Sequence, residues 1–201
     1  MSEELELSRR ALLRSVGAAL AAGQVLDAQE VEHMHEAAAQ ERAAGPYKPK
    51  ALTAHEYATL QRLSDLIIPA DERSPGALAA GAADFIDFLC AASDEMRDIY
   101  SGGILWLDEA MKRRNHSADF LSSPPARQTA LLDLIAYRKN ASPELNPGIR
   151  FFTWCRRMVA DAYYTSPIGY KEVGYMGNTA LSHFSVPPEA LEYALKRSPL
   201  G

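Results

Sequence analysis

Histidine and acidic side chains are the residues of this sequence best suited to chemistry. His33 and His35, flanked by Glu32 and Glu36, are residue types that bind metal ions. On a helix, residues two apart point about 200° apart, so the two imidazole rings converge only if the segment is extended. We therefore interpret the pair as solvated histidines.

The remaining histidines and one pair of aspartates offer no complete catalytic group. His55 falls in the first turn of an expected helix, where it serves the cap, and His116 and His183 have no evident acid or nucleophile beside them. Asp84 and Asp87 are three residues apart on an expected helix, a spacing that could suit acid–base work. A polar stripe beside an apolar stripe is also the ordinary pattern of a surface helix, so we expect both carboxylates to be solvated.

Nucleotide and metal motifs are missing from the sequence. No two glycines are separated by a single residue, which excludes the dinucleotide-binding fingerprint, and there is no Walker loop. The sequence also lacks the C-x-x-C-H, H-E-x-x-H and G-x-S-x-G patterns of covalent haem, zinc and hydrolase sites. The sequence therefore predicts no catalytic residue, no cofactor and no metal in this chain.

Two cysteines, Cys90 and Cys155, fall on helix faces that the pattern predicts to be buried. In an oxidising compartment they could form a disulfide that closes a long loop. Two buried free thiols are the other interpretation, because an unpaired cysteine behaves as a small apolar core residue.

Size, composition and charge limit the kinds of domain and surface that this chain can form. A chain of 201 residues that is 47% hydrophobic and 23% charged has the composition of one globular domain. Its net charge of -5, with the lysines and arginines scattered, excludes a broad positive surface for nucleic acid. No uncharged apolar run reaches about eighteen residues, so the sequence predicts no transmembrane helix.

The N-terminal segment, residues 1–28, has the layout of a bacterial signal peptide. An arginine pair is followed over residues 15–26 by an uncharged segment that is rich in alanine and glycine. This resembles a twin-arginine signal, and it predicts export of the folded protein to the periplasm by that route. The other interpretation is an amphipathic first helix with ordinary surface arginines. The residues that carry the signal are Ser8, Arg9, Arg10, Leu12 and Leu13.

Clear helix signals begin only after a polar segment over residues 29–51, in which a glycine and two prolines favour extended backbone. We interpret this segment as an arm that is free or lies on a partner. Thr53 and Glu56 then form a capping box, and apolar residues at helical spacing predict a helix over residues 54–68, which Pro69 ends.

The pattern that follows predicts an all-α fold, with a single compact multi-helix domain over residues 52–201. A helical run near residues 84–98 is broken near Ser93. The next run is interrupted by Gly102 and Gly103 and ends in basic residues, which suit the negative end of a helix.

Prolines mark the starts of the later helices. Pro124-Pro125 opens one helix, and Asn146-Pro147 starts another with Asn146 as its cap. Pro187-Pro188 precedes a short final helix over residues 189–196. The residues expected on the buried face of the helix after Asn146 are Phe151, Cys155, Met158 and Ala162.

The helical pattern gives way to a Tyr- and Gly-rich segment from Thr165 to Asn178, which is too long for a simple connection. We predict a long irregular loop that contacts a partner, because tyrosine and methionine are enriched at protein interfaces. The other interpretation is a loop folded against its own domain. The predicted interface residues are Tyr163, Tyr164, Pro167, Tyr170, Tyr175 and Met176.

A series of short motifs follows the leader between Leu52 and Asn178. The motifs are Leu52-Thr53, Leu66-Ile67-Ile68-Pro69-Ala70-Asp71, Ser74-Pro75-Gly76-Ala77 with Gly81, Asp84-Phe85-Ile86-Asp87, Phe151-Phe152, Tyr163-Tyr164-Thr165-Ser166-Pro167-Ile168-Gly169 and Gly174-Tyr175-Met176-Gly177. Their order and spacing, together with the leader, resemble the gluconate 2-dehydrogenase subunit 3 family.

The resemblance implies a small, non-catalytic accessory subunit of a periplasmic FAD-dependent sugar dehydrogenase. In such complexes a large subunit similar to glucose-methanol-choline (GMC) oxidoreductases binds the FAD and often passes electrons to a cytochrome c. The small subunit carries the export signal and stabilises the large one. The resemblance therefore assigns FAD to the partner and no catalytic residue to this chain.

Two functions of other classes stay open beside this one. The chain could be a self-sufficient enzyme on an unfamiliar helical fold, or a stand-alone exported helical binding module. The missing cofactor motifs count against the first, and the aromatic segment counts against the second.

Overall fold

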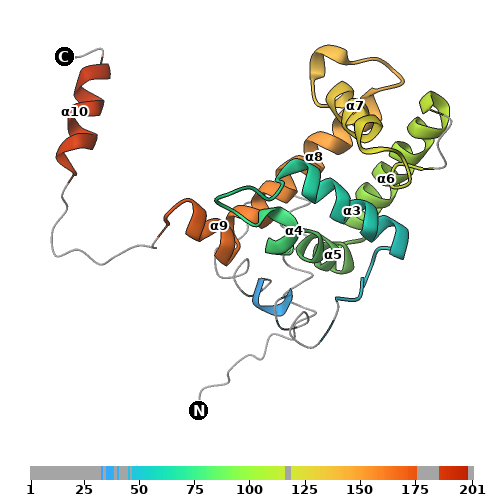
Figure 1. Cartoon of the computed structure of the whole chain (residues 1–201), viewed down its shortest axis with the longest axis horizontal. Coiled ribbons are helices and arrows are strands. Elements are labelled where there is room, and N and C mark those ends of the chain that lie inside the picture. The colour runs from blue at the N-terminus through green and yellow to red at the C-terminus, as the bar shows by residue number, and fades with distance from the viewer. Residues whose placement is uncertain are drawn as a thin grey trace.

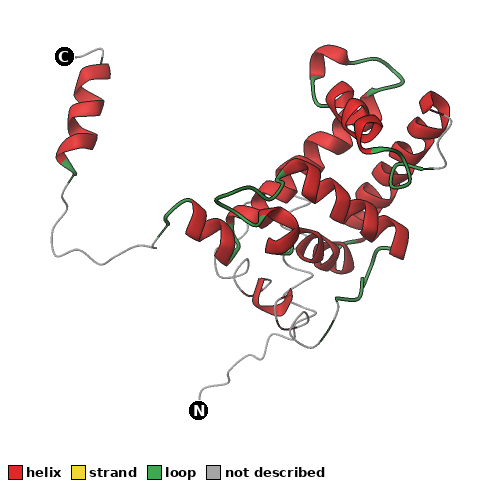
Figure 2. Ribbon diagram, in the orientation of Figure 1, coloured by secondary structure: helices red, strands yellow, loops and turns green. Residues whose placement is uncertain are grey.

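The central helix of the fold is α8 (Asn146–Tyr164), which contacts α3, α4, α5, α6, α7 and α9 (Figure 1). The computed structural model describes residues 33, 35–38, 40, 45, 47–115, 119–175 and 186–198. The other helices whose bounds are defined are α3 (Ala54–Ile67), α4 (Gly76–Ala80), α5 (Ala82–Ala92), α6 (Asp94–Asn115), α7 (Pro125–Ile135), the 3-10 helix η1 (Arg138–Asn140), α9 (Pro167–Glu172) and α10 (Pro188–Arg197). Residues 33, 35–38 and 40 are also helical. Figure 2 shows helices and loops but no strand in the described residues, which confirms the predicted all-α class.

The buried face of α8 is the one that its sequence predicts. Phe151, Cys155, Met158 and Ala162 recur at helical spacing, and all four are buried. Pro147 lies in the first turn, where the N–H that proline lacks would have no partner within the helix.

The first residue of α8 differs from the prediction. Asn146 is already helical and is not the cap, and Leu145 precedes the helix without a side-chain hydrogen bond. The backbone N–H groups of Leu145 and Asn146 donate to the carbonyl oxygen of Ser142 at 3.1 and 2.9 Å. The chain therefore turns before α8 begins, and an asparagine cap is not needed.

The predicted break between α5 and α6 is confirmed at Ser93. This residue has extended backbone (φ -137°, ψ 117°), and its hydroxyl accepts a backbone N–H from the first turn of α6 at 3.3 Å. The prediction that Gly102 and Gly103 interrupt the next run is wrong, because α6 continues through both. Contacts with α5 and α8 hold α6 in place, and the flanking side chains of Tyr100 and Ile104 are buried.

α3 begins with the predicted capping box. The Thr53 hydroxyl accepts the N–H of Glu56 at 3.3 Å, and the Glu56 carboxylate accepts the N–H of Thr53 at 2.7 Å. The helix ends at Ile67, shortly before Pro69, where the sequence predicts its end.

Part of the predicted arm lies on the helical domain. The Tyr47 hydroxyl donates to Oδ2 of Asp87 at 2.8 Å, and the Tyr47 ring stacks on Tyr57 with 5.6 Å between centroids. His35 is buried, with its ring stacked on Phe85 at 4.6 Å. At these residues the arm contacts its own domain, whereas the sequence predicts an arm that is free or lies on a partner.

The C-terminal helix, α10, lies apart from the other helices and beyond α9 (Figure 1). Its bounds confirm the helix predicted over residues 189–196, with one further residue at each end. Every residue of α10 is exposed, so the helix presents all of its faces to solvent.

Candidate partner interface

The candidate interface begins with α9, which lies where the sequence predicts an irregular loop. The Ser166 hydroxyl accepts the N–H of Gly169 at 3.1 Å, and Pro167 occupies the first turn. The same hydroxyl donates to the carbonyl oxygen of Tyr163 at 2.6 Å, which joins the cap to the end of α8. Residues 167–172 are therefore helical, although so short a stretch shows no helical periodicity in the sequence.

α9 packs closely on the C-terminal end of α8 because residue 169 is glycine. A Cβ atom at Gly169 would lie 2.1 Å from the carbonyl oxygen of Tyr163 and 2.7 Å from Cα of Tyr164. Both are backbone atoms, which cannot move without displacing α8. The glycine therefore permits the close approach that fixes α9 on α8.

The C-terminal end of α9 places Tyr175 beside Tyr170. Gly174 has left-handed backbone (φ +66°), and the N–H groups of Tyr175 and Gly174 donate to the carbonyl oxygens of Tyr170 (3.0 Å) and Lys171 (3.3 Å). This pair of hydrogen bonds is a Schellman motif, which commonly includes an apolar contact between the two residues at its ends, here Tyr170 and Tyr175. The two tyrosine rings accordingly lie 5.5 Å apart between centroids.

These elements leave several large side chains exposed together at the end of α8 and along α9. Tyr164, Tyr170 and Tyr175 keep 46%, 37% and 55% of their surface exposed. The aromatic surface, as we name it, consists of Tyr164, Pro167, Tyr170, Val173 and Tyr175. Sequence reasoning missed Val173, although it is an apolar residue within the same segment, and the predicted Met176 lies outside the described residues.

Tyr163 belongs to the core, and its predicted place in the interface is wrong. It is fully buried, and its hydroxyl is hydrogen-bonded to Ser74 and to the carboxylate of Glu172. Burial, followed by the hydrogen bond to Glu172, raises the pKa of Tyr163 above its ordinary value. Adjacent helical residues point about 100° apart, so Tyr163 faces the core while Tyr164 faces solvent. Tyr163 therefore supports the aromatic surface from below.

Asp84 and Asp87 are buried, and the prediction that they are solvated is wrong. Asp87 accepts the backbone N–H groups of residues 50, 51 and 52 at 2.7, 3.2 and 2.9 Å, in addition to the Tyr47 hydroxyl. Asp84 accepts the hydroxyl of Tyr57. Four donors thus replace the water that Asp87 loses on burial, and the Tyr57 hydroxyl does so for Asp84. The two aspartates hold the arm and α3 on α5.

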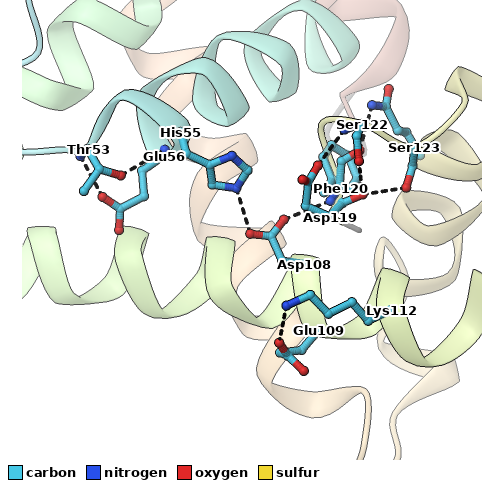
Figure 3. A network of polar contacts seen from close by, with 11 residues as sticks. Thr53, His55, Glu56, Asp108, Glu109, Lys112, Asp119, Phe120, Ser122 and Ser123 are labelled. Carbon is cyan, nitrogen blue, oxygen red and sulfur yellow. Dashed lines mark hydrogen bonds and ion pairs between the residues drawn. The ribbon is translucent and has the colours of Figure 1, made fainter. Parts of the chain in front are cut away.

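His55 belongs to a polar network between α3 and α6 (Figure 3). Its Nε2 lies 2.8 Å from Oδ2 of Asp108, and Oδ1 of Asp108 accepts the N–H of Phe120 at 2.9 Å. Asp108 therefore joins α3, α6 and the turn that precedes α7. His55 thus holds α3 against α6 through the carboxylate of Asp108.

The other histidines occupy separate surroundings. His33 is exposed, as predicted, but the interpretation of His35 as solvated is wrong, because its ring is buried and its Nε2 lies 2.7 Å from Oγ1 of Thr165. The two side chains therefore occupy different surroundings, as expected for helical residues two apart. His116 and His183 lie outside the described residues. Within the part of the chain that the structure describes, no three potential metal ligands come together.

Cys90 and Cys155 are free thiols in the structure, and both are buried. Burial raises the pKa of Cys155 to about 12, and burial together with the nearby Asp87 raises the pKa of Cys90. The structure thus agrees with the interpretation of two buried thiols that stay protonated.

A groove of about 500 Å³ lies between α6 and the N-terminal half of α8, whereas the aromatic surface lies at the other end of α8. Both tryptophans of the chain, Trp106 and Trp154, line it. Arg150 is the one charged side chain of the lining, which is otherwise mainly apolar. The lining contains no nucleophile and no carboxylate.

The predicted export signal lies outside the described residues, so Ser8, Arg9, Arg10, Leu12 and Leu13 stay a prediction from sequence. The described helices include none with the length and apolar composition that crossing a membrane requires.

The fold and the candidate interface define a helical protein that presents an exposed aromatic surface at the end of α8 and along α9. The pattern of the family described as gluconate 2-dehydrogenase subunit 3 matches residues 54–181, which is more than half of the chain. This chain belongs to the gluconate 2-dehydrogenase subunit 3 family, and it is therefore a subunit of a dehydrogenase complex. Searches of curated proteins and of solved structures found no match to the chain.

Proposed function

We propose that this chain is the non-catalytic small subunit of an exported FAD-dependent dehydrogenase of gluconate- or glucoside-type sugars, and that its aromatic surface binds the large subunit. The observation that carries the proposal is the family match, which runs from α3 through α9 and so includes the whole aromatic surface. Because the sequence has no dinucleotide fingerprint, the proposal assigns FAD to a large subunit of the GMC type.

The geometry of the aromatic surface suits tight binding. Gly169, the Ser166 cap and the buried Tyr163 hold α9 against α8 before any partner arrives. A surface that is already ordered loses little conformational entropy on association. Tyrosines at the centre of such a surface bury large apolar areas while their hydroxyls still reach hydrogen-bond partners.

Binding of this kind stabilises the large subunit by mass action. A partner that binds only the folded form raises its free energy of unfolding, and the flavin site gains the same protection. The chemistry then belongs to the large subunit, which oxidises the sugar and passes the electrons to a cytochrome c subunit or another acceptor.

The proposal also gives this chain the export function. A twin-arginine signal on the small subunit would carry a folded, flavin-loaded large subunit to the periplasm, because that machinery moves folded proteins. Replacing Arg9 and Arg10 by Lys should then leave both subunits in the cytoplasm. Normal periplasmic dehydrogenase activity in this variant would contradict the carrier function.

Gentle purification of the affinity-tagged chain from its native host tests the central proposal. We expect a larger protein in roughly stoichiometric amount, a yellow flavin spectrum, and sugar-dependent reduction of a dye acceptor. A colourless chain that is recovered alone and binds no flavoprotein would instead indicate a stand-alone binding module.

A further inference from the structure

Exposed large apolar side chains are concentrated near the C-terminal end of the chain. Among the described residues, eight of the twelve exposed large apolar side chains lie between Tyr164 and Leu195. Four of the eight belong to the aromatic surface, and the other four are Val186, Leu191, Tyr193 and Leu195, in or just before α10. The aromatic surface therefore accounts for only half of the apolar exposure in this region.

α10 has local features that favour a helix without stabilising it alone. Pro188 lies in the first turn, Glu192 and Lys196 form an ion pair at 2.6 Å, and Arg197 lies 3.9 Å over the ring of Tyr193. Each of these pairs contributes little by itself, and isolated helices shorter than about 12 residues are marginal in water. α10 therefore needs a surface that covers its apolar side.

The two sides of α10 differ in chemistry. Leu191, Ala194 and Leu195 share one face of a helix with 3.6 residues per turn, whereas Tyr193 and Lys196 lie on the opposite side. The two leucines are 50% and 61% exposed. The apolar face is thus uncovered by the described part of this chain.

We propose that α10 is a second docking element, which lays Leu191 and Leu195 into an apolar groove on the flavin subunit. This inference rests on the proposed function and adds a specific binding segment to it. Helices that bind in grooves use apolar residues one turn apart as anchors.

The place of α10 in the chain favours the flavin subunit as its receptor. Residues 176–187 separate the two docking elements, and twelve extended residues span at most about 40 Å. A partner bound to the aromatic surface therefore lies within reach of α10. Binding at the first element also raises the effective concentration at the second, so two modest contacts give one stable complex.

Two other receptors predict different measurements. If α10 returned to the groove between α6 and α8, it would contact Trp106 and Trp154, so tryptophan emission of the isolated chain reports on that groove alone. If α10 bound a second copy, the isolated chain would form a dimer. The flavin subunit as receptor predicts neither effect.

The test uses the full chain and the flavin subunit that co-purifies with it from the native host. Binding of the separated flavin subunit is measured for wild type, for the double variant Leu191→Asp with Leu195→Asp, and for Tyr193→Asp. The Tyr193→Asp control places the same charge on the opposite side of the same helix. We expect the double variant to weaken binding at least about tenfold, since two anchors are lost, and the control to stay near wild type.

Each outcome separates the inference from the proposed function. Equal affinities for wild type and the double variant would overturn the docking of α10 and leave the accessory function intact, whereas a wild type that binds no flavin subunit would remove both. A change in tryptophan emission when residues 186–201 are deleted, or a dimer that the double variant abolishes, would also overturn the inference. Because α10 buries no residue, both variants should unfold at the wild-type temperature, which verifies their fold.

Discussion

Gly103 of α6 lies against the ring of Phe151 of α8, and a Cβ atom at residue 103 would come within 2.0 Å of Cδ2 of that ring. The neighbouring Gly102 has open space where its Cβ would be. On the facing helix, Gly148 makes the matching close contact, because a Cβ there would lie 2.2 Å from the Trp106 ring. Each helix thus contributes a glycine that receives an aromatic ring from the other.

The two adjacent glycines of α6 should respond to alanine in opposite directions. Gly103→Ala forces Phe151 to move within the core and should lower the free energy of unfolding by about 1–3 kcal/mol. Gly102→Ala meets no atom and restricts the unfolded chain, so it should raise the free energy of unfolding by about 0.5–1 kcal/mol. Urea unfolding of both variants checks this, and a loss of stability in both would contradict the packing described here.

Asp87 should be among the polar residues on which stability depends most. Asp87→Asn keeps the shape of the side chain, but its amide N–H₂ group faces donors that the carboxylate accepts in wild type. The loss of these hydrogen bonds should lower the free energy of unfolding by about 2 kcal/mol. Asp94→Asn is the control, because Asp94 is exposed and pairs only with Arg97 at 2.9 Å, so its loss should be below about 1 kcal/mol. Equal effects in the two variants would show that the arm is not held through Asp87.

Asp71 should make part of the stability dependent on acid. Hydrogen bonds from the backbone N–H groups of Arg73 and Ser74 lower the pKa of Asp71 below its ordinary value of 3.8. A lowered pKa in the folded state gives stability that is present above pH 3.8 and is lost as the pH falls through the folded value. The free energy of unfolding should therefore fall less in Asp71→Asn than in wild type when the pH is lowered from about 6 to below 3.8. Unfolding curves recorded at several pH values check this. An identical pH dependence in the two proteins would contradict this linkage.

The two thiols should be unreactive until the chain unfolds. Cys90 and Cys155 are buried and their pKa values are raised, so little thiolate forms near neutral pH. We expect no reaction of the native protein with a thiol-specific dye and two thiols per chain after unfolding without a reductant. No thiols after unfolding would instead establish the disulfide.

Charge on the aromatic surface should weaken the complex. Changing Tyr170 and Tyr175 together to Asp should lower the amount of flavin subunit that co-purifies, because desolvating two carboxylates at an interface is costly. Tyr137→Asp is the control, since Tyr137 is equally exposed but lies between α7 and η1. Unchanged flavin content in the double variant would remove the aromatic surface from the interface.

Elements with strong local signals were predictable from the sequence. The capping box at Thr53, the break at Ser93 and the prolines at the starts of α7, α8 and α10 each act within a few residues, so their outcome hardly depends on the rest of the chain. The course of α6 through Gly102 and Gly103 was not predictable, because it depends on a ring supplied by Phe151 from another helix.

In the candidate interface, too, some features follow from the local sequence and others only from tertiary contacts. The sequence places five tyrosine and methionine residues of the predicted set in one segment, but neighbouring Tyr163 and Tyr164 look alike in a string of letters. Only the packing of α8 buries the first and exposes the second. The spacing of Asp84 and Asp87 is equally compatible with exposure to solvent and with burial in the core. The hydrogen-bond donors that compensate the burial of Asp87 come from residues 47–52, some 35–40 positions away.

The sequence alone determined the all-α class, the places where most helices start and stop, and the family, because caps, prolines and apolar periodicity act locally. Tertiary structure alone decided which tyrosines form a surface, which carboxylates are buried, and that the six residues Pro167–Glu172 form a helix. Those outcomes depend on contacts between residues far apart in the chain, whose free energies no local pattern contains.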